Sequence, residues 1–370
     1  MRVAIDGMLL GGRHSGVENS IEALVRALPE AAPQHQYLLA HTAAYTAPQA
    51  VNSLLAPGWV RGRLARILYE QCCLSAALRG RCDILHCPGY VMPLNWRGPS
   101  VLTVHDLIAL QFPQWCRRSN VLHYRFMLPR SIARATAVVV PSETTERVVG
   151  ERFPQAAGKL QVIPVGLDER YRPAAEEAIA ELRHRLNLPE RFLLCVGNLE
   201  PKKNLAAVVK AFDALCEGGG PADIQLVIAG KPAWDFADVT VAVGQSPHRS
   251  RIHVLGYVAD ADMPALYTAA ALLVQWSLYE GVGLPPLEAM ACGTAVVVSD
   301  GGALPEVAGP AALVVPLGPP ERLAEAVATL LADDVQLADL RHRGLVHAAR
   351  FTWPAHARAV AALYEEILNA

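Results

Sequence analysis

The chain has 370 residues, of which 52% are hydrophobic and 18% charged, and its net charge at pH 7 is -2. This length favours two domains over a single core, and the composition excludes disordered and fibrous chains. No apolar run approaches the roughly 20 residues that a membrane-spanning helix needs, and the first residues lack the pattern of a secretory signal. We therefore expect a globular protein of the cytoplasm.

The first half of the chain alternates between short apolar strands and longer helical segments. The β-branched run RVAI at residues 2–5 predicts a strand, the glycines Gly11, Gly12 and Gly16 predict a loop, and an apolar stripe predicts a helix over 16–28. Further strands are expected in YLLAHT, CDILHC, SVLTVHD and TAVVVPS, with helices over 64–78 and 120–135.

The second half repeats this order. FLLCVG predicts a strand, NLEPKKN a loop and the next segment a helix; IQLVIAG, RIHVLGYV, AALLVQWS, TAVVVSD and AALVVP predict further strands, with helices over 263–269, 284–291 and 321–331. Such alternation is typical of α/β folds with parallel sheets covered on both faces, so we expect two doubly wound domains. The breakers Pro164, Gly166 and Pro173 place the boundary. The expected division is 1–168, 169–353 and a last helix in 354–370 that is free to pack elsewhere.

Cysteine spacing and charge exclude two classes of partner. The eight cysteines form no CxxC pair or metal-ligand spacing and are expected to be reduced core thiols, so no metal site is predicted. Residues 1–165 carry 17 basic against 10 acidic residues, a net +7, which leaves -9 for the remainder. No charged tail or aromatic and basic interleaving is present, so nucleic acid is not an expected partner.

Polar residues that follow strands are the candidate site residues, because ligands of doubly wound sheets bind at the carboxyl ends of the strands. In the first half these are the glycine loop from Gly11 to Gly16, and His105. The loop suits a phosphate or sugar near backbone amides and a helix N-terminus, although a plain strand-to-helix turn explains it equally well. An imidazole at His105 can bind a hydroxyl or stabilise charge, or be structural.

In the second half the candidates are two lysines and two acids. Lys202 and Lys203 lie between a strand and a helix, where they suit a diphosphate or form a solvated loop. Glu280 lies in a glycine loop and suits sugar hydroxyls, whereas Glu288 lies inside an apolar helix, which gains nothing structurally from a carboxylate, and suits a ribose diol. Asp260 and Asp262 have the spacing of a metal-bound nucleotide-sugar site, but they fit a helix cap and a first-turn acid better.

Together these motifs resemble the retaining family 4 glycosyltransferases of the GT-B class. DGMLLGGRHSGVENSIEAL, TVHDLIALQFPQW, VIPVGLDERYRP, VGNLEPKKNLAAVVKAF and YEGVGLPPLEAMACGTAVVVSDGGALPEV occur in the family's order, and the resemblance covers essentially the whole length. It implies two Rossmann-like domains facing a cleft, the acceptor on the first, the nucleotide on the second, and a C-terminal helix that crosses back to the first.

The resemblance also implies roles for single residues. His105 would lie near the transferred sugar, Lys203 would neutralise the leaving diphosphate, and Glu280 would bind hydroxyls near the reacting carbon; these form the expected catalytic set. The implied donor-binding residues are Gly12, Gly16, Asn198, Lys202, Lys203, Gly281, Val282, Gly283, Leu284 and Glu288, with the loop from Gly302 to Glu306 beside them. Asn198 and Lys202 stand where many members have Arg, so neutralisation of the phosphate charge depends more on the lysines.

The implied reaction is metal-independent transfer of a hexose from a nucleoside-diphosphate sugar, with retention and without a cofactor, to a saccharide or lipid-linked acceptor of surface-polysaccharide synthesis. The sequences GNLEPKKNL and GLPPLEAM are similar to the corresponding motifs of mannosyltransferases, which favours GDP-mannose over UDP- or dTDP-linked hexoses as the donor. A sugar-nucleotide epimerase of the same fold and a nucleotide-sugar binding protein without turnover are the alternatives, and assays with donor alone separate them.

An arginine-rich segment suggests the location of the enzyme. Residues 61–134 hold eleven arginines against the acids Glu70, Asp83 and Asp106. Solvated arginines are the ordinary explanation, but a phosphate-bearing acceptor at the inner face of the cytoplasmic membrane, with peripheral binding to anionic lipid, explains the excess better. The apolar residues expected to contact lipid are Leu64, Ile67, Leu68, Trp115, Leu122 and Phe126.

Overall fold

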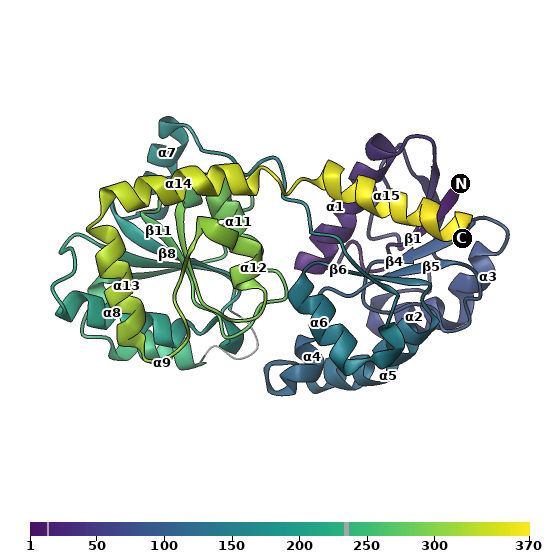
Figure 1. The fold of residues 1–370 in the computed structure, drawn as a ribbon, viewed down its shortest axis with the longest axis horizontal. Coiled ribbons are helices and arrows are strands. Elements are labelled where there is room, and N and C mark those ends of the chain that lie inside the picture. Colours follow the sequence, from purple (N-terminus) through teal and green to yellow (C-terminus); the bar gives the residue numbers. More distant parts are fainter. Residues whose placement is uncertain (13–14, 233–236) are drawn as a thin grey trace. The chain divides into compact units, whose positions relative to one another are not determined.

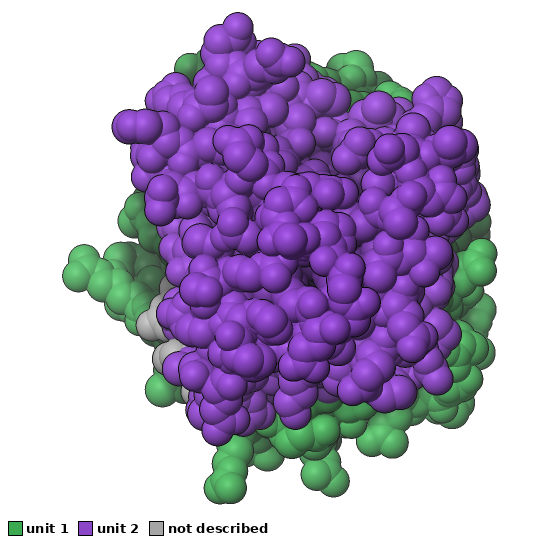
Figure 2. Space-filling view, turned by 90° about the vertical axis from the view of Figure 1, so that its left-hand side faces the viewer, with its two compact units in different colours: residues 1–168, 351–370 green, residues 169–350 purple. Residues whose placement is uncertain are grey.

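The structure is a computed structural model that describes residues 1–12, 15–232 and 237–370. They form two compact α/β units, shown as a ribbon in Figure 1 and in different colours in Figure 2. Unit 1 comprises residues 1–168 and 351–370, and unit 2 comprises residues 169–350. The second division, at 350, falls slightly before the position expected at 353.

Unit 1 contains a parallel sheet with the strand order β3-β2-β1-β4-β5-β6-β7. The residues of β4, β5 and β6 are all buried, as expected for strands covered by helices on both faces. The sequence pattern does not predict β3, because this edge strand is short and largely exposed and therefore has no apolar run. The strands are β1 (Arg2–Asp6), β2 (Gln36–His41), β3 (Asn52–Leu55), β4 (Ile84–Cys87), β5 (Ser100–Thr103), β6 (Ala137–Val140) and β7 (Leu160–Val162).

The helices of unit 1 include two departures from the expected pattern. The helix predicted over 64–78 contains a π-helical turn, η1 (Glu70–Leu74), which divides it into two α-helical parts. The sequence pattern also does not single out the two helices α4 and α6. The remaining elements of this unit are α1 (Gly16–Ala31), α2 (Gly62–Tyr69), α3 (Ser75–Leu78), α4 (Ile108–Gln111), η2 (Pro113–Trp115), α5 (Arg118–Arg134), α6 (Glu143–Arg152), η3 (Pro154–Ala156) and α15 (Trp353–Asn369).

The C-terminal helix α15 packs against α1 in unit 1 (Figure 1). Its buried side chains Val360 and Tyr364 join the apolar stripe of α1 in one core cluster. The Tyr364 hydroxyl lies 2.6 Å from Nδ1 of His86, which is a buried residue of β4. Gly166 permits the approach of the chain, since a Cβ there would lie 2.5 Å from the backbone of Trp353. The last helix is thus an integral part of the unit formed by the first half of the chain.

Unit 2 contains a parallel sheet with the strand order β10-β9-β8-β11-β12-β13. Its strands agree with the predicted apolar runs and are β8 (Phe192–Val196), β9 (Gln225–Ala229), β10 (Ile252–Gly256), β11 (Leu272–Gln275), β12 (Ala295–Val298) and β13 (Leu313–Val314). Both units therefore have the doubly wound, Rossmann-like architecture that the alternation predicts.

Helices cover both faces of the unit 2 sheet, and the main core of this unit lies between the sheet and helices such as α8 and α13. Their elements are α7 (Glu176–Leu186), η4 (Pro201–Lys203), α8 (Leu205–Glu217), α9 (Ala237–Gln245), η5 (Arg249–Arg251), α10 (Met263–Ala269), α11 (Leu284–Ala291), α12 (Leu304–Ala308), η6 (Gly309–Ala311), α13 (Pro320–Leu331) and α14 (Asp334–Ala348). Within the described ranges, no helix is long and apolar enough to cross a bilayer.

Candidate active site

Two loops of unit 2 that are distant in sequence meet at one edge of the sheet. Strands β8 and β11 are parallel neighbours, so the residues that follow them lie side by side at their carboxyl ends. Lys202 and Lys203 form the turn η4 after β8, and Glu280 follows β11. A hydrogen bond from the Leu278 N–H to the Lys202 carbonyl, 2.8 Å long, fastens the two loops together.

Glu280 is the centre of a buried polar cluster in these loops. Its Oε1 accepts a hydrogen bond from Lys203 Nζ at 2.6 Å and one from Gln275 Nε2 at 3.1 Å. Its Oε2 accepts one from Lys202 Nζ at 3.3 Å. The side chains of Glu280, Lys203 and Lys202 are 6%, 12% and 19% exposed. The site therefore combines one buried anion with two nearly buried cations, which leaves an excess of positive charge.

The lysines keep this carboxylate ionised. Burial by itself would raise the pKa of Glu280, but the charges of Lys203 and Lys202 and the hydrogen bonds from Lys203 and Ser277 outweigh burial and lower the pKa to about 2. A residue with this pKa accepts hydrogen bonds at physiological pH and has no proton to give. Glu280 is therefore suited to hold donors, such as hydroxyl or ammonium groups, and unsuited to general acid catalysis.

A glycine in the preceding turn leaves the space through which the Lys203 side chain reaches Glu280. Gly197 has a φ of 136°, and a Cβ at this position would lie 2.9 Å from Cε of Lys203. Any larger residue would displace the lysine side chain, in a backbone conformation that also favours glycine. The neighbouring Asn198 is exposed, and its backbone carbonyl accepts a hydrogen bond from the Glu200 N–H within the turn.

The loop from Gly281 to Leu284 leads into α11 and is braced by a second glycine loop. Gly283 has a φ of 80° and precedes the first residue of the helix, and the partly buried Val282 lies beside it. Gly302 forms a bridge with Glu280, and a Cβ at Gly302 would lie 2.3 Å from the Glu280 carbonyl oxygen. The segment after β12 thus lies directly against the loop that carries Glu280.

Glu288 lies on α11 and faces two tyrosines. The Tyr267 hydroxyl donates to Glu288 Oε2 at 2.6 Å, and Tyr171 donates a second hydrogen bond to the same carboxylate. Burial raises the pKa of Glu288, against the lowering effect of these two hydroxyls. The expectation that this helix gains nothing structurally from Glu288 is therefore wrong, since the carboxylate links α11 to α10 and to residue 171.

In the glycine loop of unit 1, the residues on either side of 13 and 14, which lie outside the described residues, bind an acidic side chain. Glu18 accepts hydrogen bonds from the N–H groups of Gly12 (2.7 Å) and Ser15 (3.1 Å), and the Ser15 hydroxyl in turn accepts from the Glu18 N–H. This is a capping box extended to the glycine loop. Gly16 begins α1 and has open space around it, since a Cβ there would contact nothing within 4 Å. The helix start is open at Gly16, while Glu18 already occupies the amide of Gly12.

His105 is fixed in one orientation by the backbone. Its Nε2–H donates to the Pro88 carbonyl at 2.9 Å, and the ring of Tyr90 contacts it edge-on. Burial lowers the pKa of His105, so the ring is neutral at pH 7. With the proton on Nε2, the other nitrogen Nδ1 is a hydrogen-bond acceptor. The side chain is suited to accept from a hydroxyl group.

The expectation that Asp260 and Asp262 are a helix cap and a first-turn acid is wrong, since α10 has no capping side-chain hydrogen bond and no acid in its first turn. Asp262 is the N-cap residue of α10, but its side chain makes no capping hydrogen bond. Its carboxylate instead forms a bidentate pair with Arg185 at 2.6 and 3.0 Å, and Asp260 accepts from Tyr257 at 3.4 Å. The predicted cap is therefore replaced by a link between α10 and α7. Among the described residues, no group of three or more His, Cys, Asp or Glu could hold a metal ion.

The arginine-rich segment presents apolar side chains from two helices of unit 1. Leu64 and Leu68 on α2 and Leu122 and Phe126 on α5 are more than half exposed. Arg63 joins the helices, since its Nη1 donates to Asn120 Oδ1 at 2.6 Å. The other two predicted lipid contacts, Ile67 and Trp115, are only partly exposed, and the Trp115 ring stacks on Phe112. The exposed set is therefore smaller than the predicted one.

Several residues that form hydrogen bonds with Glu280 and Glu288 are not expected from the sequence. Gln275 and Ser277 are buried beside Glu280, and the two tyrosines bind Glu288. A signal for Gln275 was present, because this amide ends an otherwise apolar strand. Nothing in the chain order connects Tyr171 or Tyr267 with a residue of α11, since this contact arises from tertiary packing.

Two family descriptions match the chain, one for each half. Residues 14–171 match "Glycosyltransferase Family 4", and residues 179–345 match "Glycosyl transferases group 1". The first match lies in the half that contains the glycine loop and His105, and the second includes the Lys202, Lys203 and Glu280 cluster.

Curated relatives and solved structures agree with these matches. The chain is 29% identical over 283 residues to the O-antigen chain mannosyltransferase B of Escherichia coli, a match that covers 75% of this chain and 73% of that protein. It is 28% identical to the serotype-specific mannosyltransferase WbdA of Escherichia coli over 69% of this chain, which spans only 32% of that relative. The fold is similar to that of sucrose-phosphate synthase from Thermosynechococcus elongatus, with a TM-score of 0.79, 20% identity, and coverage of 100% and 99% of the two chains.

Proposed function

Because the chain belongs to the family 4 glycosyltransferases of the GT-B class, we propose that it moves mannose from GDP-mannose to a saccharide or lipid-linked acceptor with retention of configuration. The proposal of mannose is supported by the two Escherichia coli relatives described above, which are named as mannosyltransferases. The observation that carries the proposal is the cluster of Lys202, Lys203 and Glu280, in which two ammonium groups surround one carboxylate.

The excess positive charge of this cluster suits the departure of a nucleoside diphosphate. Negative charge accumulates on the phosphate oxygens as the bond to the sugar breaks, and preorganised cations stabilise that charge. Lys203 and Lys202 are held in place by Glu280 before any ligand arrives, so little reorganisation is needed. We assign to the lysines the leaving diphosphate, with the backbone near Gly16 as a further contact.

The remaining side chains are assigned to hydroxyl groups. Glu280, ionised and free of a proton, would accept from hydroxyls of the transferred sugar, and His105 would accept through Nδ1. Glu288 would bind the ribose diol, with the two tyrosines holding its carboxylate. No side chain in this set is a convincing covalent nucleophile. Same-face substitution assisted by the leaving phosphate is therefore the proposed route to retention.

The experiment that tests the proposal is donor turnover followed by NMR of the product. The protein is first screened for thermal stabilisation by GDP, UDP and dTDP, since a ligand of the folded state raises the melting temperature. With GDP-mannose and an O-antigen-like acceptor, the new linkage should keep the donor's anomeric configuration. An inverted product contradicts retention, and an epimerised donor without transfer supports the alternative enzyme class.

Metal independence is a separate part of the proposal and has its own test. The lysines supply the charge that a metal ion supplies in other transferases, so an excess of EDTA should change the rate by less than about twofold. A rate abolished by EDTA and restored by manganese or magnesium contradicts this assignment.

We also propose peripheral binding of unit 1 to anionic membranes. Exposed Leu64 and Leu122 lie on helices that are rich in arginine, and each basic residue near anionic lipid contributes about 1 kcal/mol. Co-sedimentation with anionic and neutral liposomes should show binding to the anionic ones alone, weakened by salt and by Leu64→Ser with Leu122→Ser. Equal binding to both liposomes, or to neither, removes the membrane from the proposal.

A further inference from the structure

Tyr90, in the loop after β4, has a backbone conformation that few side chains adopt. Its φ is 72°, and among the described residues the only others besides glycine with a positive φ are Asn187 and Asn204. Asparagine tolerates this left-handed region, whereas an aromatic residue there is strained. Such strain persists only where surrounding contacts compensate for it, and it is common at functional sites. The contacts of Tyr90 therefore indicate its role.

Two hydrogen bonds of Tyr90 bind residues on both sides of His105. Its N–H donates to the Thr103 carbonyl at 3.1 Å, which fastens the loop after β4 to the end of β5. Its hydroxyl donates to Oδ2 of Asp106 at 2.9 Å, and Oδ1 of that carboxylate accepts from the Ile108 N–H at 3.0 Å. Burial and the charge of Asp106 raise the pKa of the Tyr90 hydroxyl well above its ordinary value, so this hydroxyl remains a donor.

The same loop holds the imidazole of His105 itself. The Nε2–H of His105 donates to the carbonyl of Pro88, which lies two residues before Tyr90. The ring centroids of Tyr90 and His105 are 5.3 Å apart, and the ring planes make an angle of 61°. An edge contact of this kind restrains the plane of the imidazole, and the carbonyl decides which nitrogen carries the proton. Tyr90 therefore contacts His105 directly and also holds the loop that supplies its acceptor.

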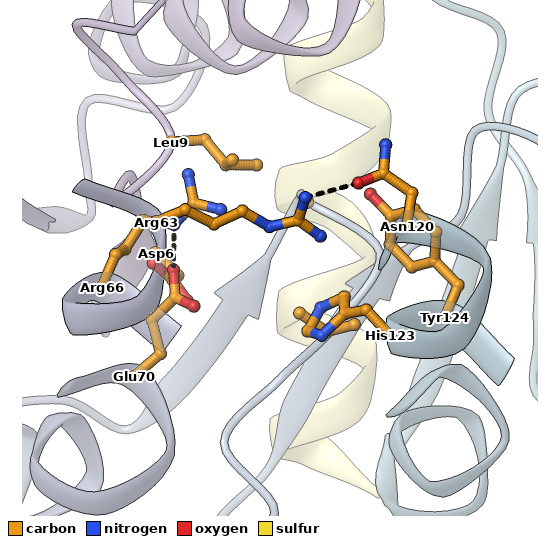
Figure 3. A pocket seen from close by; sticks show the side chains of 10 residues that line it. Asp6, Leu9, Arg63, Arg66, Glu70, Asn120, His123 and Tyr124 are labelled. Atoms are coloured by element: carbon orange, nitrogen blue, oxygen red, sulfur yellow. Dashed lines mark hydrogen bonds and ion pairs between the residues drawn. The ribbon is translucent and has the colours of Figure 1, made fainter. Parts of the chain in front are cut away.

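A further ring contact keeps the Tyr90 side chain in one orientation. Its ring centroid lies 5.2 Å from that of Tyr124 on α5, with the planes tilted by 47°. Figure 3 shows the Tyr124 ring at one side of a polar pocket of about 230 Å³, with Asp6 and Glu70 at the opposite side. Any other rotamer of Tyr90 would lose both ring contacts and the hydrogen bond to Asp106. The orientation of Tyr90 is thus determined before it acts on another residue.

We propose that Tyr90 is a positioning residue for His105, an inference that rests on the proposed role of His105 as an acceptor for a sugar hydroxyl. Its ring fixes the plane of the imidazole, and the loop that it fastens keeps the proton on Nε2, so that Nδ1 is the acceptor. Glycine would relax the backbone at residue 90 but would supply neither the ring nor the hydroxyl. Support of this kind matters because a small misplacement of a group beside the reacting sugar lowers the rate.

The test observes the hydrogen bond of His105 directly, by NMR of the full-length chain labelled in its histidine rings. The readout is the hydrogen-exchange rate of the Nε2 proton, which is assigned by its loss in His105→Gln. Tyr90→Phe removes the hydroxyl alone, and Tyr90→Leu removes the ring as well. Tyr37→Phe is the matched control, because Tyr37 is a buried tyrosine of the same unit whose hydroxyl donates to the Ala32 carbonyl at 3.0 Å.

Exchange of this proton should be slow in the parent and in the control. It should be faster by about tenfold in Tyr90→Phe and faster still in Tyr90→Leu, because the loop that carries the Pro88 carbonyl opens more often. With GDP-mannose, kcat should fall in the same order, on the order of tenfold for Tyr90→Phe. The KM for the donor should change by less than about twofold, because the leaving diphosphate is assigned to the lysines of unit 2.

The strain at residue 90 has its own readout in the melting temperature. Tyr90→Gly should melt at a higher temperature than Tyr90→Ala, since glycine takes a positive φ without strain and alanine does not. A Tyr90→Ala protein that melts at or above Tyr90→Gly counts against the inference, because the backbone would then not be strained.

Parent-like exchange in both Tyr90→Phe and Tyr90→Leu overturns the inference, as does equally fast exchange in Tyr37→Phe, which would indicate a general loosening of unit 1. Tyr90→Phe keeps the packing of the ring, so the test holds even where Tyr90→Leu does not fold. The exchange measurement needs no donor and is therefore independent of turnover. If the parent transfers no mannose, the proposed function fails, while accelerated exchange in the Tyr90 variants alone still supports the positioning of His105.

Discussion

The two units bury carboxylates in opposite ways. Glu280 in unit 2 lies within 3.3 Å of two ammonium groups and has a pKa of about 2, whereas Glu70 in unit 1 has its nearest cation at 3.6 Å, faces a second acid, and has a raised pKa. Burial is similar, so partner distance and charge decide the protonation state. A buried acid with two cations in contact therefore stays ionised and holds those cations in place, whereas a buried pair of acids with a more distant cation retains a proton.

Removal of the nearer cation should have the largest effect. Lys203→Met leaves Glu280 buried with one cation at 3.3 Å, and breaking a buried ion pair costs on the order of 3 kcal/mol in the free energy of unfolding. If Lys203 also stabilises the leaving diphosphate, kcat/KM should fall by about 100-fold or more. Urea unfolding and steady-state transfer assays measure these changes.

Lys210→Met is the matched control, because Lys210 is exposed on α8 in the same unit. It should leave the free energy of unfolding and kcat/KM close to the parent values. A Lys203→Met protein that unfolds and transfers sugar like this control contradicts both the structural and the catalytic role of the lysine.

Two acids of the same loop and helix should differ in what they change. Glu280→Gln should lower kcat on the order of 100-fold, because the charged acceptor for the hydroxyls of the transferred sugar is lost. It should not weaken the binding of GDP, because the two lysines stay available to the phosphates. Glu288→Gln should lower the affinity for GDP about tenfold with a smaller change in kcat, because a charged acceptor for the ribose is lost. Calorimetric GDP titrations and transfer kinetics separate the two. If both variants keep the kcat and the GDP affinity of the parent, Glu280 and Glu288 have a structural role and not a functional one.

The smallest predicted effect is on the pH dependence of stability, which should differ between the buried acids Glu280 and Glu70. Glu280 has a lowered pKa, so its stabilisation is present above about pH 4.5 and is lost as the pH falls toward 2. Glu70 has a raised pKa, caused by burial and by Asp6 and opposed by Arg66, so the folded state binds more protons and stability falls as the pH rises above 4.5. Glu70→Gln should therefore raise the melting temperature at pH 8 by about 3 °C and change little at pH 5.

Melting curves of the parent, Glu70→Gln and Glu22→Gln at pH 5 and pH 8 make this measurement. The Glu22→Gln control removes an exposed carboxylate, so it should not change the pH profile. A Glu70→Gln profile that parallels the parent would mean that the carboxyl pair does not hold an extra proton in the folded state.

The sequence by itself determined all but one short edge strand, the two doubly wound units and the position of most candidate residues. Apolar runs such as AVVV and glycine loops are local signals, and a parallel sheet places each strand's following loop at one edge. The proximity of Lys203 and Glu280, both candidate site residues, could be predicted for this reason. The short exposed strand β3 could not, because it has no apolar run to predict it.

Only the tertiary structure decided which side chains meet. The ion pairs of Glu280 join residues 77 and 78 positions apart, and Tyr171 and Tyr267 satisfy a carboxylate on another helix. The pocket of Asp6 and Glu70 depends on a π-helical turn that no periodicity predicts. Protonation states follow from such contacts, since desolvation and charge distance depend on the packed arrangement and not on the order of residues along the chain.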